Sequence, residues 1–518
     1  MKKALLKYYA FLPLLLLCFF YAYKAVTFPI HDFSNYYFGG KFLAEGNFNS
    51  RIYFPYEFNK AVSDLGYQHI FANYAPNTPF LALLFLPLSF VSALTAKLIF
   101  NCISIGLLVL SIYRLFSFYK ISPKYALLIP LLFLVPIKNN LLFGQVYFLL
   151  FFLLSEGWIA YQKERWKSVA FFWSLAILLK VFPALLLLVL LFKKQWKPII
   201  YLALSFLLLF GISILFTGID IWFFYLKEVL PKASNGEIAN SFVDNYQSVF
   251  MFLKRLFVYE NVENSHPFSR AYSYFPIAVL AFKIGILTLG YFVSKAKSNV
   301  LFVFSYWILA MILLSPYGST YTFILLLFPF LVLLKSEISN VKKNVFCAMI
   351  FLINNLPLSL FIENNFPFSY LRLLFLTAFF IFFVICLFQK SALVKAVIIG
   401  CIAFFIGTFS KQKRSEKSEA FLMKGSPILI YDYQVKNDLL TYFYWNEKGE
   451  NKASIHFKSS SAIDLDIKEN QIVSKKSILT FDKSHKCKPM LIDNKTVIYL
   501  SDYDRGIGFY TLRKIELH

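Results

Sequence analysis

Long apolar runs separated by short polar loops make up the chain as far as residue 410. The first run, residues 4–23, follows Lys2 and Lys3 and is long enough to cross a bilayer, because a helix rises about 1.5 Å per residue. It lacks a clean small-residue cleavage site, so we expect a retained anchor rather than a signal peptide. Further apolar runs predict membrane helices at residues 81–91, 96–113, 198–216, 274–293, 300–314, 322–334, 345–361, 371–388 and 397–409.

Two other apolar runs are too short or too broken to cross a membrane as plain helices. The run at residues 125–136 is short, and the run at residues 169–192 is interrupted in its middle by Lys180 and Pro183. Irregular backbone at membrane depth is tolerated only where protein buries it or where it lines a wet cavity, so these runs indicate a site. The basic loops at residues 162–167 and 193–197 fit a re-entrant hairpin with Lys180 at its far turn, and one tilted, kinked span is the alternative.

The pattern changes in the last part of the chain. Residues 411–518 are polar, with alternating apolar and polar positions between Asn, Asp and Gly turns, which is typical of short strands. We therefore expect a transmembrane domain at residues 1–410 and a small β-rich domain at residues 411–518. Basic clusters between apolar runs belong on the cytoplasmic side, which places the tail and two long loops, residues 25–77 and 218–271, outside the cytoplasm. The clearest strand patterns are at residues 426–433, 453–457 and 496–500.

Composition supports the same class. Hydrophobic residues make up 58% of the 518, and only 15% are charged, which excludes a water-soluble protein. The net charge of +24 does not indicate nucleic acid as a partner, because most basic residues stand in short clusters between apolar runs, where lipid headgroups account for them. The six cysteines suggest neither a disulfide framework nor a metal site, since five lie in apolar runs and Cys487 is alone in the tail. We expect no cofactor.

An aspartate stands at the mouth of the membrane domain. Asp32 lies in an aromatic stretch, residues 29–56, that directly follows the first apolar run, and it shares a helical face with Tyr36. A carboxylate in this place, beside His31, is a candidate catalytic base. The alternative is that Asp32 only caps a helix, as aspartate does readily.

Six short motifs then follow one another in a set order. They are Asp32-Phe-Ser-Asn-Tyr-Tyr, Tyr74-Ala-Pro76, Gly144-Gln145, Lys180-Val-Phe-Pro183, Asn245-Tyr-Gln247-Ser248 and Ser315-Pro316. In this order they resemble glycosyltransferase family 87, whose members are integral-membrane mannosyltransferases. The resemblance does not cover the tail beyond Phe409. Family members often carry Trp or His after the Ser-Pro pair, where this chain has Tyr317.

The resemblance implies a GT-C-like polytopic α-helical fold, for which we expect about 11 to 13 transmembrane helices in a cell (inner) membrane. It also implies an inverting transfer of a sugar, usually mannose, from a polyprenyl-phosphate donor to an extracytoplasmic lipid or glycan acceptor. A transporter or flippase of lipid-linked sugars is the competing class, because broken helices with polar residues also describe transporters. Two features favour the enzyme: no inverted repeat is visible, and the polar residues cluster in external loops.

The resemblance also suggests roles for single residues. Asp32 matches the catalytic carboxylate, and no metal ligand is implied. Lys180 is expected to bind the donor phosphate, because an ammonium group inside an apolar run is costly unless it meets an anion or water. Snorkelling or an internal ion pair is the alternative for Lys180. Contacts to the sugar or acceptor are expected from His31, Tyr36, Gln145, Asn245 and Gln247, for which capping, packing or a place in the interfacial aromatic belt is the competing explanation.

Overall fold

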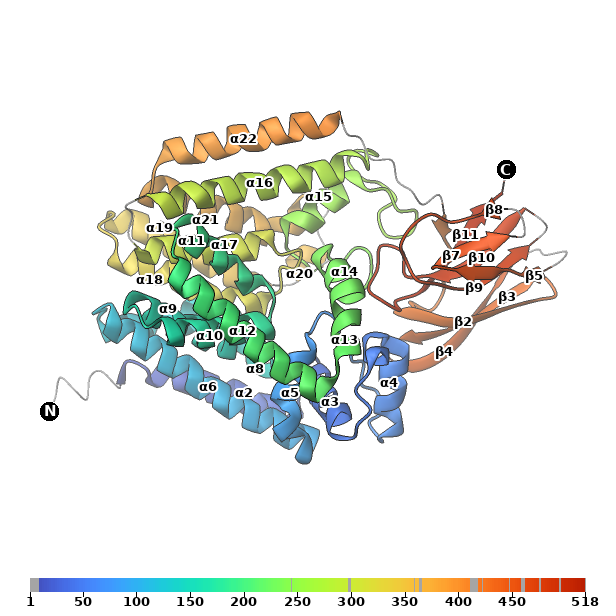
Figure 1. Ribbon diagram of the computed structural model, residues 1–518, viewed down its shortest axis with the longest axis horizontal. Coiled ribbons are helices and arrows are strands. Elements are labelled where there is room, and N and C mark those ends of the chain that lie inside the picture. Colours follow the sequence, from blue (N-terminus) through green and yellow to red (C-terminus); the bar gives the residue numbers. More distant parts are fainter. Residues whose placement is uncertain are drawn as a thin grey trace.

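The computed structural model describes residues 9–517 apart from residues 244, 297–299, 358, 363–365, 410–417, 422, 447, 458–461, 475–476 and 493–494. Helices form a large bundle, and the strands gather in a β-rich domain at one end of it (Figure 1). The last described helix ends at Thr408 and the first described strand begins at Glu419.

Five helices are long and apolar enough to cross a membrane. A sixth span results if the bent pair Pro123–Leu132 and Leu134–Phe143, at 70° to each other, counts as one. The predicted polytopic helical membrane fold with a β-rich tail is therefore confirmed, with five to six full-length spans in the described residues rather than about 11 to 13. The five are α6 (Ala93–Phe118), α12 (Trp196–Thr217), α16 (Tyr274–Lys295), Phe368–Leu387, which comprises η7 (Phe368–Tyr370) and α21 (Leu371–Leu387), and α22 (Lys390–Thr408).

The difference in number arises because most of the other apolar runs fold as short helices, some of them lengthened by a 3-10 turn. Each such helix is shorter than the stretch of about 20 residues that crosses a bilayer without a break. They are α2 (Leu12–Thr27), α5 with η2 (Pro79–Phe85, Leu86–Phe90), η3 with α7 (Pro123–Leu128, Ile129–Leu132), α8 (Leu134–Phe143), α10 (Trp166–Leu179), η4 with α11 (Phe182–Leu185, Leu186–Phe192), α17 (Val300–Leu314), η6 with α18 (Thr320–Leu326, Leu327–Lys335), α19 (Asn340–Asn355) and α20 (Ser359–Ile362).

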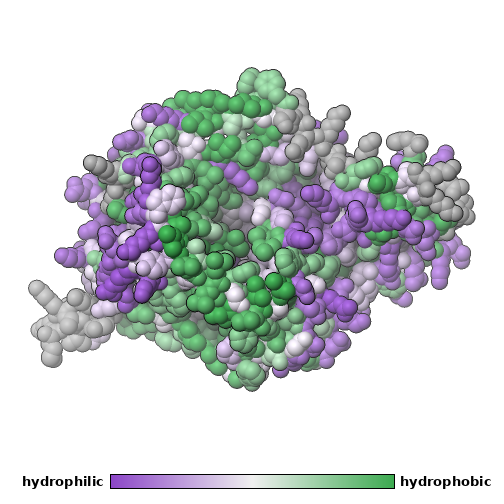
Figure 2. Space-filling view, in the orientation of Figure 1, coloured by the Kyte–Doolittle hydropathy of each residue, from purple (hydrophilic) through white to green (hydrophobic). Residues whose placement is uncertain are grey.

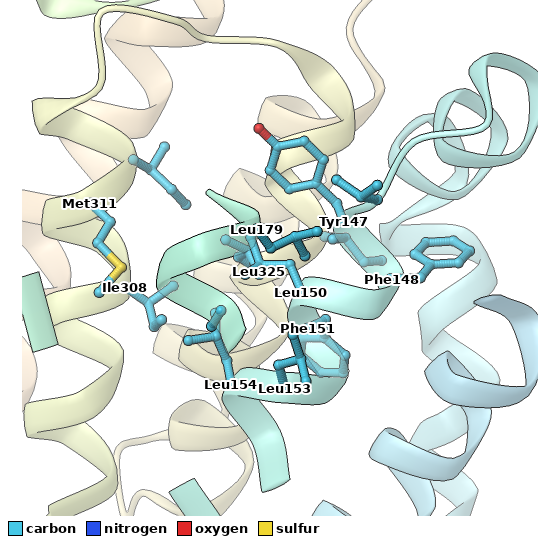
Figure 3. Close-up of a cluster of buried hydrophobic side chains, with 14 of the residues drawn as sticks. Tyr147, Phe148, Leu150, Phe151, Leu153, Leu154, Leu179, Ile308, Met311 and Leu325 are labelled. Carbon is cyan, nitrogen blue, oxygen red and sulfur yellow. The ribbon is translucent and has the colours of Figure 1, made fainter. Parts of the chain in front are cut away.

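One central helix lies outside the predicted runs. Helix α9 (Tyr147–Gln162) is buried on every face and packs against α6 and α10. Its apolar side chains meet residues of α17 and η6 in one cluster, which includes Phe151, Ile308 and Leu325 (Figure 3). A helix that is apolar all round belongs in the interior of a bundle, and α9 takes that place here.

The outer helices present apolar side chains to the surface. On α12 and α22, Leu215 is 83% exposed and Phe405 is 65% exposed. Figure 2 shows a hydrophobic surface across the helices, with hydrophilic residues over the β-rich domain and along the opposite end of the bundle. Apolar faces of this extent are not stable in water, so they lie against lipid.

The two long loops of the sequence contain helices that cover the end of the bundle nearest the β-rich domain (Figure 1). In the first loop they begin at Phe33, soon after α2 ends at Thr27. In the second they occupy part of what the sequence indicated as a mixed loop. They are α3 (Phe33–Ala44), η1 (Ser50–Tyr53), α4 (Pro55–Asp64), α13 (Ile219–Phe224), the π-helical turn η5 (Tyr225–Val229), α14 (Leu230–Ser234) and α15 (Val249–Phe257).

The β-rich domain holds three antiparallel sheets, with strand orders β1-β11-β10-β9-β5, β2-β3-β4 and β6-β7-β8. The first two share a core that includes Ile430, Leu440 and Leu500. The predicted strand patterns lie on β2, β4 and β10. The strands are β1 (Glu419–Ala420), β2 (Leu429–Lys436), β3 (Leu439–Asn446), β4 (Gly449–His456), β5 (Ala462–Asp464), β6 (Asp466–Lys468), β7 (Gln471–Ser474), β8 (Ser477–Ile478), β9 (Lys486–Ile492), β10 (Thr496–Ser501) and β11 (Thr511–Glu516).

Candidate active site

Asp32 directly precedes α3, but its side chain does not cap that helix. No hydrogen bond joins the carboxylate to the first turn of α3. Instead Oδ2 accepts a hydrogen bond from Nε2 of Gln145, which lies 113 residues later in the chain. The hydroxyl of Tyr36 donates to Oε1 of the same Gln145 at 2.7 Å. The carboxylate is thus held by an amide and a phenol, and the capping alternative does not describe its contacts.

Gly144 brings Gln145 to this position. It ends α8 in the left-handed conformation with φ +65°, which glycine adopts without the strain of a side chain. A Cβ at Gly144 would also lie 2.8 Å from Cβ of Phe33 on α3. Because only a glycine permits both the turn and the close approach, the end of α8 meets the start of α3, and the next residue faces Asp32.

Burial and nearby charges have opposite effects on the carboxyl group of Asp32. Burial raises the pKa of the Asp32 carboxyl, although the hydrogen bond from Gln145 and the charges of nearby basic residues act in the opposite direction. One of these bases, Lys97 of α6, is fully buried, and its Nζ donates to the carbonyl of Pro29 at 3.0 Å. The sequence reasoning missed Lys97, whose signal was a single charge near the start of a long apolar run.

A cavity of about 420 Å³ lies between the broken helix at Lys180, helices α16 and α17, and the two long loops. Its lining contains two ammonium groups, Lys180 and Lys283, and no aspartate or glutamate among the described residues. One part of the wall is apolar, with Phe182, Leu287 and Met311 among its members. Asp32 lies close enough to Lys180 to interact with it electrostatically.

Lys180 lies at the break between α10 and α11. Its backbone is extended, with φ −148° and ψ 131°, so α10 ends there and the side chain projects from an interrupted segment. Nζ of Lys180 donates to Oδ1 of Asn77 at 3.0 Å, and no salt bridge of Lys180 is found among the described residues. Lys283 comes from within the long helix α16, and its ammonium group has no hydrogen bond or ion pair in the described part of the chain.

Five tyrosines form much of the polar lining, and the sequence reasoning named none of them as site residues: Tyr147, Tyr225, Tyr246, Tyr317 and Tyr321. Tyr147 begins α9, and its hydroxyl points away from the apolar cluster beneath it (Figure 3). Tyr147, Tyr246 and Tyr321 all interact electrostatically with Asp32. Tyr246 and Tyr317 were within reach of sequence reasoning, because each stands inside or directly after one of the quoted motifs.

Among the predicted site residues only Lys180 lines the cavity, and Asp32, Tyr36 and Gln145 lie beside it rather than in its lining. His31 is exposed, and its ring stacks on Phe28 with 5.1 Å between the centroids. Asn245 is exposed, while Gln247 is buried and donates from Nε2 to the carbonyl of Ser369 at 2.9 Å. The structure therefore joins Gln145 to Asp32 and Tyr36 to Gln145 by hydrogen bonds, and His31 and Lys180 lie near enough to Asp32 to interact with its charge. The side chains of Asn245 and Gln247 are outside this group.

The arrangement has the parts of a group-transfer site: an anchored carboxylate, two ammonium groups that form no ion pair within the described residues, and a cavity with one apolar wall. In comparison with known families, the model of glycosyltransferase family 87 matches residues 75–316, a region that includes Gln145, Lys180 and the Ser315-Pro316 pair but not Asp32. This match confirms the resemblance seen in the sequence. Neither a curated protein nor a solved structure matches the chain.

Proposed function

Residues 75–316 mark the chain as a membrane glycosyltransferase of family 87, and from this premise we propose that it moves a sugar from a polyprenyl-phosphate donor to a hydroxyl of a lipid or glycan acceptor. Mannose is the sugar that the family resemblance favours. The reaction is a single displacement with inversion at the anomeric carbon.

The charge of the cavity is the observation that carries this proposal. Lys180 and Lys283 line a cavity that has no acidic side chain among its described lining residues, inside a helical bundle whose outer faces are apolar. Ammonium groups in such a place are costly unless an anion or water meets them. A lipid phosphate supplies both an anion for the lysines and a hydrocarbon chain for the apolar wall. A free nucleotide sugar lacks the hydrocarbon chain, and a neutral sugar lacks both.

The contacts of Asp32 suit a general base. The carboxylate would accept the proton of the acceptor hydroxyl as its oxygen attacks the anomeric carbon. The bond from that carbon to the phosphate oxygen breaks, and the electron pair leaves with the polyprenyl phosphate. Lys180 and Lys283 would stabilise the negative charge that grows on the leaving phosphate, which is the usual role of cations in transfer reactions of this kind. No covalent intermediate is needed.

We place the site and the β-rich domain on the extracytoplasmic face of a cell membrane. The distribution of basic loops supports this orientation. The domain also contacts both long loops, through Tyr56 stacked on Tyr431 in the first and Lys232 bonded to Asp502 in the second. Alkaline phosphatase fused after His518 should therefore be active, whereas fluorescence from a reporter that folds only in the cytoplasm would reverse the orientation.

The direct test is transfer by membranes that contain the protein. Radiolabelled polyprenyl-phosphate mannose is supplied in parallel with polyprenyl-phosphate glucose, a polyprenyl-diphosphate sugar and a nucleotide sugar, and the labelled product is identified. We expect product from a polyprenyl-phosphate sugar only. Product from the nucleotide sugar alone would overturn the donor assignment. Movement of the labelled lipid across vesicles without a new glycosidic bond would establish the transporter instead.

A further inference from the structure

A loop of the β-rich domain is inserted into the helical domain. This tip loop, residues 502–509, connects β10 and β11. Its Ile507 is 2% exposed and belongs to the same buried apolar cluster as the membrane helices, rather than to the core of the sheets. The β-rich domain is therefore not a freely hanging appendage on the bundle.

The tip loop holds one wall of the cavity. This wall segment, residues 230–241, contributes Leu230, Ala233, Ser234 and Ile238 to the cavity lining. Nζ of Lys232 reaches Oδ1 of Asp502 at 3.1 Å and the carbonyl of Arg505 at 3.0 Å. Further bonds between the tip loop and the wall segment include Gly506 N to Ala239 O at 3.0 Å, Arg505 Nη1 to Asn240 Oδ1 at 3.1 Å, and Ser241 Oγ to Asp504 Oδ2 at 2.6 Å.

Two ion pairs fasten the same loop to the chain that follows the wall segment. Nζ of Lys254 lies 2.8 Å from Oδ1 of Asp504, and Nη2 of Arg505 lies 2.7 Å from Oε1 of Glu263. Lys254 is buried, at 1% exposed, and the other three partners are partly buried. Shielded charge pairs cost much free energy when one partner is removed, so the tip loop has a defined seat.

The point of closest approach is Gly506. A Cβ at this residue would lie 2.6 Å from the carbonyl carbon of Ile238, and backbone atoms cannot move aside as a flexible side chain can. From Ile238 the contacts continue toward the candidate base. The carbonyl of Ile238 accepts from Nδ2 of Asn73 at 2.6 Å, and the backbone N–H of Asn73 donates to Oδ1 of Asn35 at 2.7 Å. Asn35 is in the first turn of α3, three residues after Asp32.

We propose that the tip loop is a positioning element of the active site. It sets the wall segment against the cavity, and through Asn73 and Asn35 it fixes the start of α3, which Asp32 directly precedes. The inference goes beyond the proposed function. It rests on that function only where kcat for sugar transfer is measured. If the β-rich domain only bound material outside the membrane, its loop would not need to pack against a cavity wall.

The test is a single added methyl group, Gly506→Ala, in the full chain. Alanine fits the backbone conformation of this residue, so the steric contact with Ile238 is the main change. The matched control is Gly211→Ala on α12, where an added Cβ meets nothing within 4 Å. Hydrogen–deuterium exchange is measured without substrate, and kcat and KM are measured with donor and acceptor.

In Gly506→Ala we expect faster exchange in residues 230–241 and at the start of α3, while the strands stay protected. We also expect kcat to fall about 10- to 100-fold, since small misplacements of catalytic groups have effects of this size. The control should behave as the wild type in both measurements. Unchanged exchange in the wall segment, or faster exchange with an unchanged kcat, would overturn the proposal.

A charge swap provides the second variant in case Gly506→Ala does not fold. Arg505→Glu should speed exchange in the wall segment, and adding Glu263→Arg in the same chain should slow it again. An exchange rate in Arg505→Glu equal to that of the wild type would contradict the claim that the tip loop holds the wall segment in place. The exchange measurements need no substrate, so a wild type that transfers no sugar would refute the proposed function while leaving this test decisive.

Discussion

The two ends of the candidate site are built differently. At the acidic end, Asp32 is tied to Gln145, and Gln145 is tied in turn to Tyr36, so the carboxylate has a set orientation. At the basic end, Lys180 has one hydrogen bond, to Asn77, and Lys283 has none among the described residues. Both ends are contributed by elements far apart in the chain.

The difference indicates which group must be placed accurately and which must only supply charge. A general base has to meet one proton in one direction, which favours an anchored carboxylate. An ammonium group carries three donors on a flexible stem, and it can follow a phosphate whose position changes as a bond breaks. The acidic end should therefore be sensitive to small changes in geometry, and the basic end mainly to loss of charge.

Removal of the base should have the largest effect. In Asp32→Asn the side chain keeps an oxygen that can accept from Gln145, so the fold should be retained while the base is lost. We expect kcat to fall about 100- to 10,000-fold, with thermal stability and donor binding close to those of the wild type. Asp64→Asn, an exposed aspartate of the same long loop, is the control. Substantial transfer by Asp32→Asn would remove Asp32 from the mechanism.

Loss of charge at the basic end should come next. Lys180→Met and Lys283→Met keep an apolar stem and remove the ammonium group. A hydrogen bond to a charged group contributes about 1.5–3 kcal/mol, so donor affinity should fall roughly 10- to 150-fold in each. Binding of a labelled polyprenyl phosphate measures this directly, with Lys295→Met at the exposed end of the same helix α16 as the control. Unchanged affinity in both variants would mean that the phosphate binds elsewhere.

The hydrogen bond from Gln145 to Asp32 should affect the pH dependence of kcat/KM. Because burial raises the pKa of Asp32, the acid limb of kcat/KM should lie above the value of about 3.9 for an ordinary aspartate, and activity should fall as the pH drops through it. The bond from Gln145 stabilises the charged form, so Gln145→Leu should move this limb to higher pH and lower kcat about tenfold. A limb that stays in place in Gln145→Leu would show that the base is another residue.

The smallest effect is expected from Tyr36→Phe. This change removes the hydroxyl that donates to Gln145 and leaves Gln145 bonded to Asp32. One neutral hydrogen bond contributes about 0.5–1.5 kcal/mol, so kcat should fall only a few-fold and the acid limb should barely move. Tyr37→Phe, whose hydroxyl donates to the carbonyl of Val91 instead, serves as the control. A loss as large as that in Asp32→Asn would mean that the phenol itself takes part in proton transfer.

The class of fold followed from local patterns. Apolar runs, basic loops and an alternating tail predicted a helical membrane protein with a β-rich end, because each pattern reports the surroundings that a segment can tolerate. The number of full-length spans was overestimated for the same reason. A run such as residues 300–314 is apolar in either case, and whether it spans alone or packs as a short helix depends on its neighbours.

Asp32 and Lys180 were also accessible from the sequence, since a charge beside or inside an apolar run stands out for its energetic cost. Their partners were not. The contact of Gln145 with Asp32 joins residues 113 apart, and that of Lys232 with Asp502 joins residues 270 apart. Helix α9 and Lys283 had local signals, an apolar run and a charge inside such a run, but their places in the bundle and the contacts of the tip loop were decided by tertiary packing. Periodicity and composition describe how one segment meets lipid or water, whereas these features depend on which distant segment fills the space beside it.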